Sequence, residues 1–321
     1  MATIQTITGP KDTSELGPTL THEHLSSGMG GMDRTGMYDL DAAVRRSLEC
    51  LRQAHEAGIR TVIDCTPVDL GRDAELFARV ARETDVTVVC ATGLYRWVPL
   101  SYNAWDADGA ASYFLREITD GIEGGTIKPG IIKLAWDVEY QLEPLRIQME
   151  KMARGAARAA KAAGVPITCH TRPADNHGDR LLDIFEEEGL DLRAVTIGHT
   201  NDSTDMDYVL RLAKRGATVG LDRFSPRIDD AEKERRCRVA LAMVEAGFAE
   251  QVCLSHDAAA YSLNGGPAGG GPRTENPGAF RVVPEVEVPW LQQHGVTDDQ
   301  VDAMLVRSVR ATFEAAAAMK A

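Results

Sequence analysis

The chain has 321 residues, of which 44% are hydrophobic, 26% charged and 6% aromatic, a composition typical of a globular protein with a sizeable core rather than of a disordered or fibrous chain. Its 48 acidic and 35 basic residues leave a net charge of −13, which argues against nucleic acid or an anionic membrane surface as the main partner and favours small-molecule substrates. Because no apolar run approaches the ~18 residues that span a bilayer and the first residues lack a signal-peptide pattern, we expect a cytoplasmic protein.

Short, apolar, β-branched runs recur along the whole chain and predict strands. The runs are almost continuously apolar rather than alternating, so both faces of each strand should be buried, which indicates a parallel sheet. They lie at residues 18–21, 61–65, 86–90, 130–134, 166–169, 194–197, 218–221 and 252–255.

Helical periodicity fills the stretches between these runs. Apolar stripes over 40–51 and 149–160 predict helices that end near Gly58 and Gly164, since glycine is the common residue just past a helix end. Near the C-terminus, the sequence of 297–300, Thr-Asp-Asp-Gln, is typical of a capping box.

The eight strand signals from residue ~20 to residue ~255 give roughly 33 residues per repeat, the size of a βα unit. Eight such units close into a TIM barrel, so we predict an α/β fold with a single (β/α)8 barrel domain over residues 1–321. The Gly- and Pro-rich stretch 265–272 follows the eighth strand and is interpreted as a mouth loop. In this fold the active site lies at the C-terminal ends of the strands.

Polar side chains gather at those strand ends. His22 and His24 are two residues apart and project to the same face, because side chains alternate along a strand. His170 and His199 end the fifth and sixth strands, and Asp257 follows the eighth. Neutral imidazole is a common metal ligand. Taken alone, however, a His-x-His pair also occurs by chance, and Asp257 could cap a helix.

Lys133 lies inside the apolar run 131–134, where an ammonium group is costly to bury without a partner. In one interpretation its stem packs inside while its head reaches solvent. In the other, burial favours the neutral amine, which can react with carbon dioxide to give a carbamate, an anionic ligand able to bridge two cations.

Together these side chains supply enough ligands for two metal ions that share a bridge. Such a pair would acidify a bridging water to hydroxide and polarise the bond under attack, which is metal-assisted hydrolysis. The predicted ligands are His22, His24, Lys133, His170, His199 and Asp257.

The same residues stand in motifs that resemble the phosphotriesterase family of the amidohydrolase superfamily, and the match is nearer the phosphotriesterase-like lactonases than the true phosphotriesterases. It covers nearly the whole chain in the right order. The motifs are Thr21-His22-Glu23-His24, Gly130-Ile131-Ile132-Lys133, His170-Thr171, Ile197-Gly198-His199, Gly220-Leu221-Asp222-Arg223-Phe224 and Leu254-Ser255-His256-Asp257.

The resemblance implies a ligand arrangement and a cofactor. His22, His24 and Asp257 would hold one divalent metal. His170 and His199 would hold the other, and carboxylated Lys133 and a hydroxide would bridge them. Zinc is the first choice, with cobalt, manganese and iron as alternatives. Asp257 would also carry the proton from the hydroxide to the leaving group. The family suggests a homodimer.

In the lactonases a tyrosine after strand three and an arginine after strand seven line the substrate pocket, and Tyr95 and Arg223 match those places. Alternatively, Tyr95 is only a packed ring and Arg223 only a partner for Asp222. These two residues favour a lactone substrate.

The two mouth loops depart from the lactonase pattern. The loops 26–33 and 265–272 are Gly-rich, which argues against long-chain acyl-homoserine lactones. Trp97, Tyr102 and Trp105 are candidates for apolar walls instead. Among the remaining polar residues, Glu23 and His256 alternate away from the ligands and receive no role, and His177 falls in a polar stretch expected to be exposed.

The predicted function is a binuclear metal hydrolase that opens a lactone or a related ester, with side activity toward organophosphate triesters. The alternatives are a phosphotriesterase or a carboxylester or amide hydrolase with the same site, and a metal-containing binding protein without turnover. The complete ligand set argues against the last of these.

Overall fold

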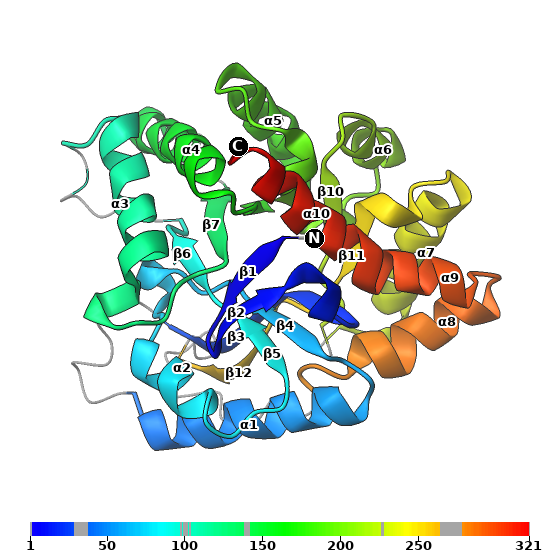
Figure 1. Ribbon diagram of the computed structural model, residues 1–321. Helices are drawn as coiled ribbons and strands as arrows, with labels where there is room; N and C mark the ends of the chain where they lie inside the picture. The colour runs from blue at the N-terminus through cyan, green and yellow to red at the C-terminus, as the bar shows by residue number, and fades with distance from the viewer. Residues whose placement is uncertain are drawn as a thin grey trace.

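Parallel strands follow one another around a central axis in chain order, and helices surround them (Figure 1). The structure is a computed structural model that describes residues 2–28, 38–96, 98, 102, 104–137, 142–225, 228–263 and 278–320. The parallel strands are β3 (Thr19–Ser27), β4 (Thr61–Asp64), β5 (Thr87–Val89), β6 (Ala91–Gly93), β7 (Ile131–Trp136), β8 (Ile167–Thr171), β9 (Val195–Ile197), β10 (Thr218–Leu221), β11 (Val252–Leu254) and β12 (Ala258–Ser262).

Two arcs of sheet make up the barrel. One has the order β12-β3-β4-β5 and the other runs from β6 to β11. The arcs meet where a strand is interrupted, because β5 and β6 are separated only by Cys90, and β11 and β12 only by residues 255–257. Backbone hydrogen bonds cross both interruptions: Gly130 N donates to Cys90 O and Asp257 N donates to His22 O, each at 3.0 Å. The predicted TIM barrel is therefore confirmed, with its third and eighth strands each in two pieces.

Helices surround the strands, and the last of them crosses one end of the barrel (Figure 1). They are α1 (Leu40–Glu56), α2 (Ala74–Val80), α3 (Ala107–Asp120), α4 (Glu143–Ala163), α5 (His177–Glu187), α6 (Met206–Lys214), α7 (Asp230–Glu245), α8 (Val288–Gln293), α9 (Asp298–Asp302) and α10 (Ser308–Ala318), with π-helical segments η11 (Val283–Glu287) and η12 (Ala303–Arg307).

The helix ends follow the predicted signals. Helix α4 ends at Gly164, which has the left-handed φ of 71° that glycine adopts without steric cost. Helix α9 begins with the predicted capping box, in which Thr297 accepts from the Gln300 amide while the Gln300 side chain accepts from the Thr297 backbone. Helix α1 continues to Glu56, two residues before the predicted stop at Gly58.

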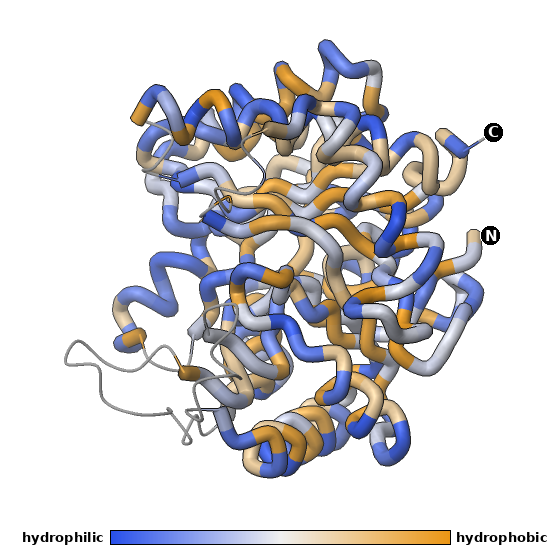
Figure 2. The backbone as a smooth tube through the Cα atoms, turned by 90° about the vertical axis from the view of Figure 1, so that its left-hand side faces the viewer, coloured by the Kyte–Doolittle hydropathy of each residue, from blue (hydrophilic) through white to orange (hydrophobic). Residues whose placement is uncertain are grey.

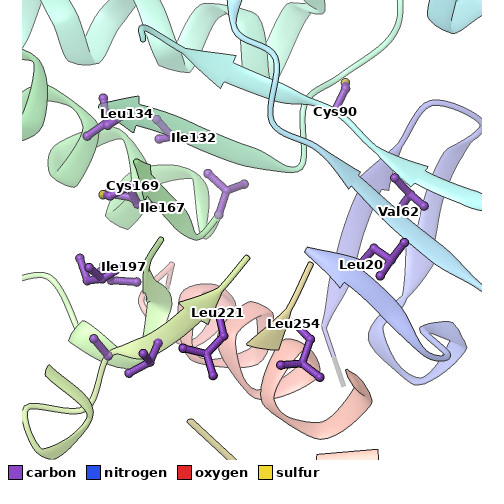
Figure 3. Packing of buried hydrophobic residues seen from close by; sticks show 14 of the residues in the cluster. Leu20, Val62, Cys90, Ile132, Leu134, Ile167, Cys169, Ile197, Leu221 and Leu254 are labelled. Atoms are coloured by element: carbon purple, nitrogen blue, oxygen red, sulfur yellow. The ribbon is translucent and has the colours of Figure 1, made fainter. Parts of the chain in front are cut away.

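The main core lies between the strands and the helices. Apolar side chains of successive strands, including Leu20, Ile132 and Leu221, are fully buried (Figure 3). Along the tube of Figure 2, hydrophobic colour follows the strands and alternates with hydrophilic colour on the outer helices. Because side chains alternate on a strand, this packing directs the intervening residues into the barrel.

Two features of the sheet differ from the sequence prediction. An antiparallel hairpin, β1 (Thr3–Thr6) with β2 (Gly9–Asp12), precedes the barrel and lies beside β5, where Ile7 N donates to Val88 O. Strand β3 also continues to Ser27, beyond the predicted end at His22-Glu23-His24, because it pairs with β12 as well as with β4. Within the described residues, no helix has both the length and the apolarity needed to cross a membrane.

Candidate metal centre

The structure brings all six predicted ligands together at the C-terminal ends of the strands. His22 Nε2 lies 2.7 Å from Lys133 Nζ and 3.5 Å from Asp257 Oδ1. His24 Nε2 lies 3.2 Å from the same carboxylate oxygen. On the other side, His170 Nδ1 and His199 Nε2 are 2.6 Å apart.

Stacking of the His22 and His199 rings, with centroids 4.9 Å apart, joins these two groups into one cluster. Donor atoms of His22, His199 and Asp257 all lie within 4.8 Å of one another and could hold a metal ion.

Each histidine of the cluster is held from behind through its other ring nitrogen. Asp222 contacts two of the rings. Its Oδ2 lies 2.6 Å from His22 Nδ1, and its Oδ1 lies 2.8 Å from His199 Nδ1. His170 Nε2 lies 2.7 Å from Asp137 Oδ2. Such carboxylate partners orient metal-bound histidines and fix their tautomer.

His24 is fixed by a hydroxyl group rather than a carboxylate. Its Nδ1 lies 2.8 Å from Thr66 Oγ1. Because that hydroxyl already donates to Ser26 O at 3.1 Å, it accepts from the imidazole.

These partners decide which nitrogens carry protons. A neutral imidazole has one N–H, and in all four rings the outer nitrogen uses it. The inner nitrogens therefore present lone pairs to one another, and those of His170 and His199 are only 2.6 Å apart. Lone pairs at that distance repel unless a metal ion or a shared proton lies between them, and burial disfavours the protonated ring. The donor set thus fits metal ions.

Burial keeps the rings of His22, His170 and His199 neutral. It lowers the pKa of His170 to about 4, against the opposing effect of Asp137. Burial likewise holds the pKa of His199 well below its usual value, with Arg223 adding to the effect, and lowers that of His22, with Lys133 second. Neutral imidazole is the form that binds metal.

Lys133 is fully buried, at 0% exposure, so the interpretation in which its head reaches solvent is wrong. It lies on β7 between the outward-packed Ile132 and Leu134, and alternation sends its side chain into the barrel. There its amine meets His22 and no carboxylate within ion-pair distance in the described residues.

Asp257 occupies the gap between β11 and β12 with an unusual backbone. Its φ of 50° is in the left-handed region, which is costly for a residue with a Cβ and typical of functional sites. Burial alone would raise the pKa of its carboxyl, but Arg223 and then His22 bring it well below the ordinary value. His199, with a φ of 64°, has the same rare backbone.

Tyr95 and Arg223, which the sequence predicts to line the substrate pocket, both contact the cluster. Tyr95 Oη lies 3.4 Å from His170 Nδ1, and Arg223 Nη1 lies 3.2 Å from Asp257 Oδ2. The alternative pairing of Arg223 with Asp222 is wrong, because Arg223 Nε instead faces Asp202 at 3.6 Å.

The predicted wall residues divide into two groups. Tyr102 and Trp105 stack on each other with ring centroids 4.0 Å apart. Trp97, the loop 265–272 and residues 29–33 of the first mouth loop lie outside the described residues.

His177 contradicts its sequence prediction. It is buried, at 6% exposure, and its Nδ1 lies 3.0 Å from Trp136 O at the end of β7. The polar neighbours of His177, such as Asn176 and Asp179, suggested an exposed stretch. His177 is nevertheless buried, because it is the first residue of α5 and its side chain points inward.

The sequence interpretation missed Asp222, Asp137 and Thr66 as partners of the ligands. Each stands at or just after the C-terminal end of a strand, the same signal that identified the ligands themselves. Asp222 was considered only as a partner for the arginine beside it.

Comparison with known proteins agrees with this geometry. A model of the phosphotriesterase family matches residues 2–313. A phosphotriesterase homology protein of Mycobacterium tuberculosis (strain CDC 1551 / Oshkosh) is 35% identical, with 98% of each chain covered. An aryldialkylphosphatase of Saccharolobus solfataricus is 28% identical, with 94% of this chain and 96% of the relative covered.

A solved structure of the phosphotriesterase from Mycobacterium tuberculosis matches with a TM-score of 0.86 and 33% identity, and the match covers 98% of both chains. The chain therefore belongs to the phosphotriesterase family.

Proposed function

We propose that the protein is a binuclear metal-dependent hydrolase that opens lactones or related esters. The observation that carries this proposal is the cluster of four histidines, each held from behind through its outer ring nitrogen, beside a buried lysine and a carboxylate. Two divalent ions, zinc in the first place, would acidify a water molecule and polarise the carbonyl group under attack.

The chain's own residues divide the remaining work. His22, His24 and Asp257 would hold one ion, and His170 and His199 the other. Lys133 would join them as a carbamate, formed when its neutral amine adds carbon dioxide and loses a proton. This amine is completely buried beside the His22 imidazole, so a carbamate on it would lie among the proposed ligands.

Asp257 is placed to move a proton. Its Oδ1 faces His22 and His24, while its Oδ2 is held by Arg223. Because its pKa is well below the ordinary value, it is ionised at neutral pH and can accept the proton of the attacking water. It would then deliver that proton to the leaving oxygen.

Tyr95 and Arg223 stand where the lactonases carry the tyrosine and arginine of their substrate pocket, which favours a lactone. Burial raises the pKa of Tyr95, so the phenol keeps its proton and can donate a hydrogen bond to an oxygen of the substrate. Arg223, the other donor, contacts Asp257 in the same cluster. Two donors at one reacting group would stabilise a developing oxyanion.

A phosphotriesterase is the second candidate, because the Saccharolobus solfataricus relative is an aryldialkylphosphatase. A phosphoryl oxygen could accept from the same donors as a carbonyl oxygen. An inactive binding protein is less well supported, since each proposed ligand and each partner behind it is present.

The test is a hydrolysis panel of γ- and δ-lactones, aryl esters, N-acyl amides and paraoxon, with metal analysis of the same preparation. We expect about two transition-metal ions per chain and the highest kcat/KM on a lactone. A single ion per chain would contradict the binuclear site. Faster turnover of paraoxon than of every lactone would favour the second candidate.

A further inference from the structure

Glu23 lies between the predicted ligands His22 and His24 on β3, and its side chain is fully buried. Since neighbouring side chains on a strand point to opposite faces, Glu23 is excluded from the metal-facing side. Its carboxylate instead contacts the junction between β11 and β12, where the barrel strand is interrupted around Asp257.

Four hydrogen bonds hold the Glu23 carboxylate at that junction. Its Oε1 accepts from Ser255 Oγ at 2.7 Å, from His256 N at 2.9 Å and from His256 Nδ1 at 2.5 Å. Its Oε2 accepts from Ala258 N at 3.1 Å. A buried carboxylate is costly unless its oxygens are satisfied, and here both oxygens are.

The two backbone N–H groups that donate to Glu23 belong to His256 and Ala258, the residues on either side of Asp257. In a continuous strand, carbonyl groups of the neighbouring strand would accept them. At this junction the left-handed φ of Asp257 turns the chain out of the ladder, and the Glu23 carboxylate supplies the acceptors instead. One side chain thereby straddles Asp257 and balances the cost of its backbone conformation.

His256 extends the same contact outward. Its Nδ1–H donates to Glu23, so its Nε2 is free to accept, and Val283 N donates to it at 2.8 Å. Val283 begins η11. The imidazole is therefore a rigid spacer between the junction and the outer layer.

We propose that Glu23 is a positioning residue for Asp257: it fixes the backbone on both sides of that residue and so sets where the Asp257 carboxylate meets His22 and His24. The inference rests on the proposed function for its catalytic consequence, but the geometry can be tested without it. It gives a role to the middle residue of the His-Glu-His motif.

The first test is a crystal structure of the metal-free Glu23→Gln variant beside the metal-free wild type. In the wild type, both oxygens of Glu23 accept from N–H groups. In either orientation of the glutamine amide, its NH2 group would face one or more of these N–H donors and could not accept from them. We expect Asp257 to leave the left-handed φ region and its Oδ1 to move out of hydrogen-bond range of His24 Nε2. An unchanged Asp257 would overturn the proposal, whatever the activity.

The second test loads both proteins with cobalt. We expect Glu23→Gln to shift the visible absorption bands of cobalt and to lower kcat about 10-fold to 100-fold, the usual range for outer partners of a metal site, with KM within about 2-fold. Unchanged bands and an unchanged kcat would overturn the proposal. A wild type without any hydrolysis would count against the proposed function alone, because the crystal comparison uses metal-free protein.

Glu117→Gln is the matched control, since Glu117 is also a buried carboxylate but accepts from Arg72 and Thr92, away from the junction. It should lose stability and keep the wild-type cobalt bands. If Glu23→Gln does not fold, Glu23→Asp, which keeps the charge but draws the carboxylate back from the two amides, takes its place in both tests. A smaller shift of Asp257 and of the bands is then expected, and no shift would overturn the proposal.

Discussion

At the scale of single residues, two aspartates of the centre have opposite positions. Asp257 faces the inner nitrogens of His22 and His24, whereas Asp222 receives the outer N–H groups of His22 and His199. The first is placed to act on the reaction and the second to hold the ligands. Substitution should therefore affect different measured quantities.

Asp257→Asn should lower turnover by ~100-fold or more and leave the fold intact, because the amide cannot accept the proton that general-base catalysis requires. The measurement is kcat on the best lactone of the panel, with circular dichroism to check folding. Asp175→Asn, which changes a carboxylate paired with Arg172, is the control and should leave kcat unchanged. Equal turnover of the wild type and Asp257→Asn would remove Asp257 from the mechanism.

Asp222→Asn should weaken metal binding about 10-fold to 100-fold, the range found when an outer partner of a metal ligand is lost. Each oxygen of Asp222 accepts from one ring N–H. An asparagine has only one such oxygen, so it can accept from the N–H of His22 or from that of His199, but not from both. The measurement is zinc titration of the metal-free protein against a chromophoric chelator. Wild-type affinity in this variant would show that the rings are oriented by packing alone.

At the scale of strands and helices, local patterns predicted the apolar parts of the barrel well. Continuous apolar runs located the eight strand positions, and Gly164 and the Thr297 capping box located helix ends. The pattern failed where a strand carries polar residues. Strand β3 runs through His22 to Ser27 because long-range pairing with β12 satisfies its backbone.

The ligands could be predicted because they stand at strand ends, where the barrel topology brings distant residues together. Their outer partners could not, because nothing local distinguishes a carboxylate that binds an imidazole from one that binds the next arginine. Asp222 and Glu23 show this limit: each is assigned by contacts with residues about 200 or more positions away along the chain.

Gly93 is the position where two strands approach most closely beside the centre. A Cβ there would lie 1.9 Å from Lys133 O, and its φ is 131°. Gly93→Ala must therefore displace the backbone of β7 at Lys133. We expect a loss of more than about 3 kcal/mol in the free energy of unfolding, since overpacking adds to the backbone cost.

Gly247→Ala is the matched control for Gly93→Ala. Gly247 also has a positive φ, of 85°, but no atom lies within 4 Å of a Cβ placed there. Its substitution should cost only the ~1–2 kcal/mol of the left-handed backbone. Urea unfolding measures both variants, and equal losses would contradict a role for the close approach of β6 and β7.

At the scale of the whole molecule, the centre exists only when the barrel has formed, because its members come from strands spread between residues 22 and 257. In the unfolded chain each histidine is in water and titrates near its ordinary pKa. In the folded chain, burial lowers the pKa of His22, His170 and His199. Folding is thus coupled to the release of protons.

The metal-free protein should lose stability as the pH falls from about 6.5 toward 4. Between the unfolded pKa of about 6.5 and the folded value, the unfolded state binds more protons, so acid favours unfolding. For His170, whose folded pKa is about 4, this amounts to about 3 kcal/mol at about 1.4 kcal/mol per pH unit. Below the ordinary aspartate value, the lowered pKa values of Asp222 and Asp257 act in the same direction.

The measurement is the free energy of unfolding in urea at several pH values, with metal removed by a chelator. His170→Asn should show a shallower decline than the wild type, because one buried titrating ring is gone. His294→Asn changes an exposed histidine near the end of α8 and should keep the wild-type slope. A stability that stays level or rises from pH 6.5 to 4 would contradict neutral, buried imidazoles and with them the inward lone pairs on which metal binding depends.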